Sequence, residues 1–536
     1  MQDKPVVLLF EEAIGFSKLE LGSKGYGLVE MVRLGLPVPP GLIIPTYVCR
    51  EYYSTGSLPT ELLTRLLEKL NIVGEKLGRK FGSLEKPLLV SVRSGAPISM
   101  PGMMDTILNL GINDRIASAL ASETGNKQFA YETYLRFIRN FSKIVLKIPD
   151  DELDRLLKRS LKNFNLENFS DFLMEDQENV LRDLVELISE KVGLPFPKDP
   201  VDQLKMAVEA VFKSWNNPRA KTYRKIYNIP DDLGTAVIIQ AMVFGNLGPK
   251  SGTGVCFTRD PSTGEKVLYG VYLMNAQGED IVSGERNPKP IEELKKELPE
   301  IYEQLKRIAE VLERHFKDMQ DIEFTIQEGK LYILQTRSGK RTIKAAVKIA
   351  VDMVKEGLIT EKEALERVEL EKLVYLLKPS VDPKVDVKPL TKGLNASPGA
   401  AMGKVVFTVN DAIIYSRKGE PVILVRPETK PEDIQGVAAA AGVLTSRGGM
   451  TSHAAVVARA LGKPAVTGAE EIQIDLDHEL FRVRDVIVKK LDIITIDGNT
   501  GNVYIGSVPL VNPEPIPELK ELLEWAGKYG KSVKIA

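Results

Sequence analysis

The chain has 536 residues, of which 43% are hydrophobic, and its 72 basic and 73 acidic side chains leave a net charge of −1. This balance excludes a nucleic-acid or anionic-membrane footprint across the whole protein, so any phosphate site must be local. Cys49 and Cys256 lie too far apart in the sequence for a zinc knuckle or a disulfide framework, and no apolar stretch has the length of a signal sequence or membrane span. We therefore expect a cytoplasmic protein. Its length predicts roughly three or four domains.

Two stretches near the N-terminus carry basic residues among glycines. Residues 22–28 (GSKGYGL) place Lys24 at an expected helix start, and residues 91–111 (SVRSGAPISMPGMMDTILNLG) combine Arg93 with a small-residue loop around Gly102. Helix starts bind anions through their backbone N–H groups, so Lys24 is a candidate phosphate contact. Arg93 and the backbone around Gly102 could also hold an anion. A solvated lysine, a salt-bridged arginine and a methionine pair that fills a core are the alternatives.

The middle of the chain changes from helical to strand patterning. Residues from about 113 to 230 show helical spacing of leucine among charged residues, interrupted by prolines at 195, 197 and 200. Alternating segments follow within 235–336, separated by turns and by one amphipathic helix over 290–316. The strands are expected at 236–244, 252–260, 267–274, 322–326 and 331–336.

Residues 242–265 (MVFGNLGPKSGTGVCFTRDPSTGE) are rich in glycine. Glycine density alone is weak evidence, and this stretch is either a long hairpin connection or a mobile cover over a polyphosphate. In the second interpretation, backbone N–H groups point at the phosphates from Ser251, Gly252, Thr253 and Gly254.

Residues 321–342 (DIEFTIQEGKLYILQTRSGKRT) alternate polar and apolar side chains, which predicts a hairpin with one polar face. A three-residue turn over 328–330 would gather two carboxylates, an amide and a guanidinium on that face, in the pairs Glu323–Gln335 and Asp321–Arg337. A two-residue turn would instead place a leucine opposite Glu323. We predict the three-residue turn, because the gathered oxygens suit Mg²⁺ bridging nucleotide phosphates. A solvated face with cross-strand charge pairs is the alternative.

After residue 342, two amphipathic helices lead into an aperiodic Pro/Val/Lys segment at 378–390 that is typical of an extended linker. A compact α/β unit follows from about 388 to 508. Its strands are expected near 405–409, 422–426, 442–446 and 493–497.

Within this unit, residues 445–459 (TSRGGMTSHAAVVAR) place His453, one of three histidines, after a Gly-Gly turn and at the start of an Ala/Val-rich helix. Unpaired N–H groups and the positive end of the macrodipole would stabilise a phosphoryl group on the ring and disfavour imidazolium. Thr451 or Ser452 can cap this helix. A hydrogen-bonded core histidine is the alternative, but few structural sites need two glycines and a capping pair together.

Together these stretches resemble the pyruvate phosphate dikinase family and occur in its order. The resemblance spans roughly residues 15–530 and includes GSKGYGL, SVRSGAPISMPGMMDTILNLG, GTAVIIQAMVFGNLGPKSGTGVCFTRDPSTGE, DIEFTIQEGKLYILQTRSGKRT and RGGMTSHAAVVARALGKPAVTG. It implies a multi-domain α/β and α+β fold with an ATP-grasp-type nucleotide-binding domain and a swivelling β/β/α phosphohistidine domain. The implied domains are 1–340 with a helical insertion at about 113–230, a helical and extended linker at 341–387, the phosphohistidine domain at 388–508, and a connecting helix with an orphan strand at 509–536.

The resemblance also implies site residues. His453 matches the phosphoryl carrier, and the positions that the family uses around ATP are matched by Lys24, Arg93, Thr253, Gly254, Asp321, Glu323, Gln335 and Arg337. Glu323 and Gln335 are expected nearest to Mg²⁺. In the implied chemistry, His453 attacks the β-phosphorus of Mg-ATP, AMP leaves, and orthophosphate takes the terminal phosphoryl group to leave pyrophosphate and phosphohistidine. Because His453 must then visit a second site, we expect a hinge at 379–392.

The family carries a phosphoenolpyruvate/pyruvate barrel of about 250 residues after the histidine domain, and this chain stops at Ala536. We therefore expect a separate barrel protein to supply that site in trans, and residues 532–536 (SVKIA) to be an orphan barrel strand. The alternatives are a phosphotransferase with another acceptor and a regulatory protein that binds ATP without turnover. ATP and phosphate are the expected ligands, nucleic acid and membrane are not expected partners, and a homodimer is left open.

Overall fold

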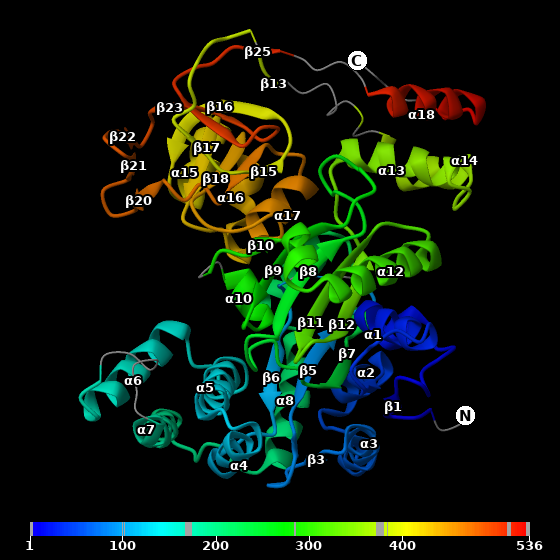
Figure 1. Cartoon of the computed structure of the whole chain (residues 1–536), viewed down its shortest axis with the longest axis vertical. Coiled ribbons are helices and arrows are strands. Elements are labelled where there is room, and N and C mark those ends of the chain that lie inside the picture. The colour runs from blue at the N-terminus through cyan, green and yellow to red at the C-terminus, as the bar shows by residue number, and fades with distance from the viewer. Residues whose placement is uncertain are drawn as a thin grey trace. The chain divides into compact units, whose positions relative to one another are not determined.

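The computed structural model describes residues 4–98, 100, 102–166, 174–283, 286–370, 373, 380–382, 384–511 and 516–531. The chain divides into two compact units, and Figure 1 labels most of their elements. The first unit runs to Leu247 and includes Tyr332–Gln335, and the second contains Gly248–Leu331 and the residues from Thr336 onward. The mixed α/β, multi-domain architecture predicted from the sequence is confirmed at this level.

An antiparallel sheet with the strand order β1-β2-β7-β5-β6 lies at the centre of the first unit. Its strands are β1 (Leu8–Leu9), β2 (Gly41–Ile44), β5 (Val90–Gly95), β6 (Thr106–Leu110) and β7 (Ala236–Ala241), and a separate pair is formed by β3 (Lys80–Phe81) and β4 (Pro87–Leu88). Strands β2, β5 and β7 are buried along their whole length. This burial explains why β2 and β7 are almost continuously apolar.

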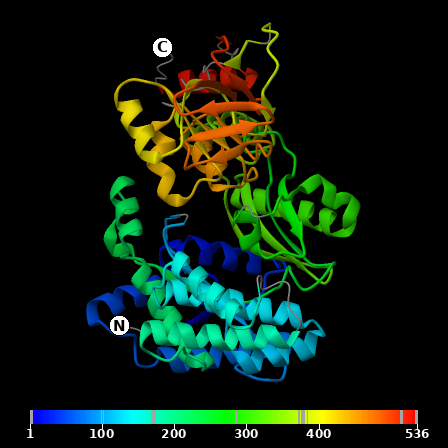
Figure 2. The ribbon, with the colours of Figure 1, turned by 90° about the vertical axis from the view of Figure 1, so that its left-hand side faces the viewer.

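This unit also contains helices. They are α1 (Lys18–Arg33), α2 (Thr46–Thr55), α3 (Leu62–Leu77), α4 (Asp114–Thr124), α5 (Lys127–Ile144), α6 (Asp150–Asn163), α7 (Met174–Val192), α8 (Pro200–Ser214) and α9 (Pro218–Ile226). Gly25 of α1 lies against Ile43 and Ile238, whereas Leu42 and Ile239, which alternate with them, belong to the cluster that includes α8. Helices α4 and α5 lie side by side, as do α6 and α7 (Figure 2).

The second unit begins with a sheet in the order β10-β9-β8-β11-β12. Its strands are β8 (Gly252–Phe257), β9 (Tyr269–Met274), β10 (Lys289–Pro290), β11 (Gln320–Gln327) and β12 (Lys330–Ser338), and its helices are α10 (Gly278–Ser283), α11 (Leu294–Glu297) and α12 (Pro299–Phe316). The single helix predicted over 290–316 is wrong. It is split at Leu298, which has φ −140 and ψ 71, because a proline disfavours helical backbone in the residue before it.

An eight-stranded sheet follows in the order β14-β24-β23-β16-β17-β18-β19-β15, with β16 to β19 parallel. The strands are β14 (Thr391–Lys392), β15 (Leu394–Ser397), β16 (Ala400–Val406), β17 (Val422–Arg426), β18 (Gly442–Thr445), β19 (Ala465–Thr467), β23 (Ile493–Asp497) and β24 (Asn502–Ile505). The helices are α15 (Val409–Arg417), α16 (Ile434–Ala439) and α17 (His453–Ala460). A small sheet, orange in Figure 2, contains β20 (Gln473–Asp475), β21 (Leu480–Val483) and β22 (Val486–Lys489). The strands predicted at 422–426 and 493–497 are confirmed.

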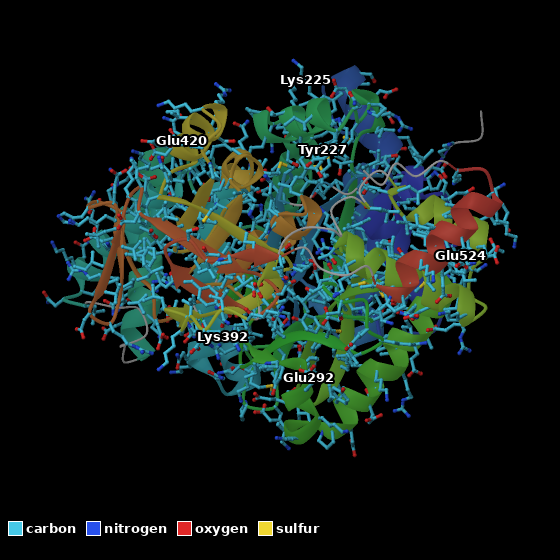
Figure 3. All side chains as sticks on the ribbon, turned by 90° about the horizontal axis from the view of Figure 1, so that it is seen from above. Lys225, Tyr227, Glu292, Lys392, Glu420 and Glu524 are labelled. Atoms are coloured by element: carbon cyan, nitrogen blue, oxygen red, sulfur yellow. The ribbon has the colours of Figure 1, made fainter. Side chains whose placement is uncertain are left out.

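The segments before and after this eight-stranded domain pack on each other. They form α13 (Ile343–Lys355), α14 (Glu361–Arg367), α18 (Pro517–Lys528), β13 (Ser380–Val381) and β25 (Leu510–Val511). Apolar residues of the three helices share one cluster, and β13 pairs with β25. Glu524 of α18 is exposed (Figure 3). Part of the predicted extended linker is thus a paired strand, whereas the predicted orphan strand at 532–536 lies outside the described residues.

None of the helices in the described part of the chain combines the length and the apolar composition that crossing a lipid bilayer requires.

Candidate functional site

Lys24 lies just after a break in α1. Gly22, inside α1, has φ 71 and ψ 162, so a second helical start follows it. The backbone N–H of Ser23 donates to the carbonyl of Ala96 at 2.8 Å, which joins this break to the end of β5. A side chain at Gly22 would lie 1.8 Å from the carbonyl oxygen of Gly95, so only glycine allows the approach. Lys24 therefore lies at the start of a helical segment, as predicted, and close to a strand end.

Arg93 is buried on β5 and contacts two glutamines. Its Nη2 donates to Oε1 of Gln335 at 3.0 Å, and its Nη1 donates to Oε1 of Gln240 at 3.3 Å and to the carbonyl of Leu334 at 3.2 Å. Arg93 and Gln335, which are 242 positions apart, are thus brought together, a contact that the sequence did not predict. The guanidinium helps to orient the Gln335 amide, because it donates to the amide oxygen.

Gly102 is exposed and has φ 71 in the loop between β5 and β6. The adjacent methionines beside it anchor the loop, because Met103 is buried with Trp215 in a small apolar cluster and Met104 is partly buried against that cluster. Nδ2 of Asn217 also donates to the carbonyl of Met103 at 3.0 Å. The core-filling interpretation of the methionines is therefore confirmed, and anion binding at Gly102 stays a prediction.

The glycine-rich segment at 242–265 does not form one mobile cover. Its residues Gly252–Phe257 form β8, which pairs with β9 on one side and with β11 on the other. The strand predicted at 252–260 is therefore confirmed over Gly252–Phe257, and antiparallel pairing on both sides directs the backbone of Gly254 at neighbouring strands, while its contact with ATP stays a prediction. A Cβ at this position would lie 2.2 Å from the ring of Phe324, which explains the glycine. Thr253 donates to the carbonyl of Phe324 at 3.1 Å, and its contact with ATP stays a prediction.

A two-residue turn joins β11 to β12. The strand bounds leave only Glu328 and Gly329 between them, and both residues have positive φ, 49 and 78. This is the geometry of a type I′ turn, whose twist matches the flanking strands, so the predicted three-residue turn is wrong. The expected pair of Asp321 and Arg337 nevertheless forms, with Nε of Arg337 donating to Oδ2 of Asp321 at 2.8 Å.

Burial and neighbouring charges act on this ion pair in opposite directions. Burial raises the pKa of Asp321; the charge of Arg337 offsets part of the rise and the charge of Glu323 adds to it. For Arg337, burial lowers the pKa, but the two carboxylates outweigh it and the pKa is raised. Burial lowers the pKa of Lys340, and Arg337 adds to the lowering. Oδ1 of Asp321 is buried without a hydrogen-bond partner among the described residues.

Glu323 and Gln335 fit the donors that Mg²⁺ requires. A carboxylate and a carboxamide supply hard oxygen ligands, and this ion keeps water and takes nucleotide phosphates as its other ligands. In the part of the chain that the structure describes, no group of three or more His, Cys, Asp or Glu side chains could hold a metal ion alone. Binding of Mg²⁺ by these residues stays a prediction.

His453 is half-buried at the first position of α17. Ser452 caps this helix, its hydroxyl accepting from the backbone N–H of Ala455 at 3.4 Å, and Gly448 has φ 101. The capping residue and the helix start follow the prediction. Of the two glycines in the turn, Gly448 adopts a backbone conformation that other residues rarely adopt.

The surroundings of His453 favour the neutral form of its imidazole. Burial lowers its pKa from the ordinary 6.5, the carboxylates of Asp433 and Glu432 act in the opposite direction, and the charge of Lys340 adds to the lowering. A neutral ring was predicted from the helix field, whereas burial is the leading cause in the structure.

Thr429 is a site residue that the sequence did not predict. Its Oγ1 lies 3.2 Å from Nδ1 of His453, and the side chain is 7% exposed. This contact distinguishes Nδ1 from Nε2, the other nitrogen of the ring. The two residues are 24 positions apart, and a threonine shortly after a strand gives no distinctive signal.

Arg459 is the second residue that the prediction omitted. It is fully buried on α17 and donates to the carbonyls of Ala396 at 2.7 Å and Met450 at 2.5 Å, which ties the loop before His453 to β15. Burial lowers its pKa to about 10, so the guanidinium remains charged at neutral pH. A lone arginine in an Ala/Val-rich helix was the available signal.

The predicted site residues thus lie in three places. The first unit holds Lys24, Arg93, Gly102 and Gln335; the first sheet of the second unit holds Thr253, Gly254, Asp321, Glu323 and Arg337; and the eight-stranded domain holds His453.

Two family models match this sequence. The model described as "Pyruvate phosphate dikinase, AMP/ATP-binding domain" matches residues 54–304 and 290–358. The model described as "PEP-utilising enzyme, mobile domain" matches residues 418–501, which include His453. The first match by itself covers more than half of the chain.

Curated proteins named pyruvate, phosphate dikinase are similar to this chain over nearly its whole length. It is 49% identical over 519 residues to the protein of Rhizobium meliloti (strain 1021), covering 94% of this chain and 58% of that protein. It is 48% identical over 527 residues to the protein of Clostridium symbiosum (98% and 60%) and over 509 residues to "Pyruvate, phosphate dikinase 1, chloroplastic" of Arabidopsis thaliana (94% and 53%). The chain therefore spans between 53% and 60% of the length of these relatives.

Proposed function

Because this chain belongs to the pyruvate phosphate dikinase family, we propose that it catalyses ATP-dependent phosphorylation of its own His453, with orthophosphate as the second acceptor. The products are AMP, pyrophosphate and phosphohistidine. The observation that carries the proposal is the environment of His453, a half-buried imidazole with a lowered pKa that directs Nδ1 at Thr429 and lies at a capped helix start.

In the proposed first step, Nε2 of His453 attacks the β-phosphorus of ATP. The bond from that phosphorus to the AMP oxygen breaks, and the imidazole carries a pyrophosphoryl group. Orthophosphate then attacks the terminal phosphorus, so that pyrophosphate leaves and one phosphoryl group stays on Nε2. Thr429 supports this reaction by accepting a hydrogen bond from Nδ1–H, because this tautomer leaves the lone pair of the neutral ring on Nε2.

The other proposed site residues orient the polyphosphate and stabilise its charge. We assign this role to Lys24 and Arg93 in the first unit and to Arg337 in the second, since phosphoryl transfer depends mainly on alignment and on electrostatic stabilisation. The pair with Asp321 orients Arg337, whose side chain remains 40% exposed. Glu323 and Gln335 would hold Mg²⁺, which neutralises phosphate charge when it is bound.

The test uses two preparations of ATP, labelled at the β- or the γ-phosphorus, with Mg²⁺ and orthophosphate. We expect the β-label to remain on the protein as an acid-labile phosphoramidate and the γ-label to leave in pyrophosphate. His453→Ala should abolish both signals. The matched control is His478→Ala, because His478 lies in the same domain with its side chain 75% exposed.

A β-label that stays on His453→Ala at the normal level would refute the proposed nucleophile. A wild-type chain that binds ATP without taking either label would instead favour the regulatory alternative.

The identity of the final acceptor stays a prediction. If a separate barrel protein supplies the phosphoenolpyruvate/pyruvate site, pyruvate added to the labelled chain should leave the label on His453, and the barrel protein should release it as phosphoenolpyruvate. Release by pyruvate alone would contradict this in-trans assignment. Release by a different small molecule would favour the phosphotransferase alternative.

A further inference from the structure

A hydrogen bond between two buried side chains joins β11 and β12 on the face opposite to the pair of Asp321 and Arg337. The hydroxyl of Thr336, on β12, donates to Oε1 of Gln320, on β11, at 2.9 Å. The two side chains are 3% and 1% exposed. Gln320 precedes Asp321 and Thr336 precedes Arg337, and successive strand residues point to opposite faces. The two strands are therefore joined at adjacent positions by one side-chain bond on each face.

Gln320 also contacts Thr258, which follows β8, and Thr258 in turn contacts α12. The backbone N–H of Thr258, next to the end of β8, donates to the carbonyl of Gln320 at 3.0 Å. The Thr258 hydroxyl accepts from the backbone N–H of Gln320 at 3.0 Å and donates to Oε2 of Glu313 at 2.7 Å. This hydroxyl serves as acceptor and donor at once, so its orientation is fixed from both sides.

Glu313 in turn pairs with the buried Arg259, which also contacts the exposed Glu356. Nη2 of Arg259 lies 2.7 Å from Oε1 of Glu313 and 2.9 Å from Oε2 of Glu356. Arg259 is fully buried, and Glu356 follows the last residue of α13. Removing one partner of a buried ion pair leaves an uncompensated buried charge, so Arg259 and Glu313 hold one another in place. A continuous chain of polar contacts thus runs from β12 to the end of α13.

We propose that Thr336 and Gln320 are positioning residues that fix how β11 and β12 pair, and thereby hold Arg337 and Asp321 in place for phosphoryl transfer. Thr336 lies directly between Gln335 and Arg337, so a displacement of this one residue moves two site residues together. The contacts from Thr258 to Arg259 brace the pair from the core side. This inference rests on the proposed function, because phosphoryl transfer is its first readout.

The experiment compares Thr336→Val with Thr336→Ser. Valine keeps the volume and removes the donor, whereas serine keeps the hydroxyl. We expect Thr336→Val to slow single-turnover transfer of the β-label about tenfold, since small displacements of reacting groups are costly, while half-saturation by ATP changes less than about twofold. Thr336→Ser should restore the rate. The matched control is Thr467→Val, because Thr467 is a buried strand residue whose hydroxyl has no partner among the described residues.

A normal rate in Thr336→Val, or an equal loss in Thr336→Ser and Thr336→Val, would overturn the proposal. If Thr336→Val does not fold, the same comparison is made between Thr258→Val and Thr258→Ser, because Thr258 is the next residue in this series of hydrogen bonds. If the wild-type chain takes no label, the proposed function is wrong, and hydrogen exchange of residues 320–338 then decides. Faster exchange in Thr336→Val than in Thr467→Val supports the strand-pairing role, and equal exchange refutes it.

Discussion

Replacement of Gly22 by alanine tests how α1 meets the central sheet of the first unit. A Cβ at this position would lie 1.8 Å from the carbonyl oxygen of Gly95. Gly95 pairs with Ala236 of β7, so its carbonyl cannot move away without disturbing the sheet. The variant must therefore straighten the break in α1 or separate α1 from β5, and either change displaces Lys24.

Two costs add at Gly22. Its φ of 71 strains any residue with a side chain by about 1–2 kcal/mol, and forcing a carbon into an occupied position costs about 1–3 kcal/mol more. We expect a total loss of roughly 2–5 kcal/mol in the stability of the first unit. Gly35 is the matched control, because its φ is 70 and a Cβ there meets nothing within 4 Å. Gly35→Ala should show only the first cost.

The assay is urea unfolding followed by tryptophan fluorescence in a Trp525→Phe background. The chain has two tryptophans, and the one that remains, Trp215, is 2% exposed in the first unit. The signal then reports one unit and avoids treating a multi-domain chain as two-state. Gly22→Ala should also raise the ATP concentration that half-saturates labelling. Equal losses in Gly22→Ala and Gly35→Ala would refute the close approach of α1 to Gly95.

Three further outcomes are expected. Thr429→Val should slow β-label transfer to His453 at least tenfold, in the range of a lost proton-handling contact, while Thr429→Ser retains the rate; an unchanged valine variant would contradict the assigned hydrogen bond. Because burial lowers the pKa of His453 below 6.5, the labelling rate should stay constant above that pH and fall only below it. As the pH falls, the imidazole of the unfolded chain binds a proton at a higher pH than the imidazole of the folded chain, so the second unit loses stability below about pH 6.5. A labelling rate that already declines above this pH would count against a neutral buried ring. Leu522→Ala, in the cluster shared by α13 and α18, should cost about 2–5 kcal/mol and speed hydrogen exchange in both helices, and faster exchange in α18 alone would show that the two do not support each other.

The sequence predicted the central strands of the eight-stranded domain and the start of α17, because each depends on a local pattern. Strands β17 and β23 are short apolar runs bounded by polar turns, and the α17 start needs only its capping serine. The strand predicted at 252–260 formed over Gly252–Phe257, where glycine at position 254 is needed for contact with Phe324. The prediction failed at the turn before β12. At the turn, Glu328 adopts the left-handed backbone with φ 49, which a non-glycine residue rarely takes.

The sequence by itself determined which residue types are available for the proposed phosphoryl chemistry and which short segments contain them. Hydrophobic periodicity and helix capping both depend only on residues that are close together in the sequence. Only the tertiary structure decided which of these residues meet. Arg93 reaches Gln335 across 242 positions, and Thr429 reaches His453 across 24. Such pairs depend on strand order and on how helices pack, and many sequence separations satisfy the same local pattern. The orientation of the His453 imidazole is therefore a property of the folded domain, although the candidate histidine can be identified from the sequence.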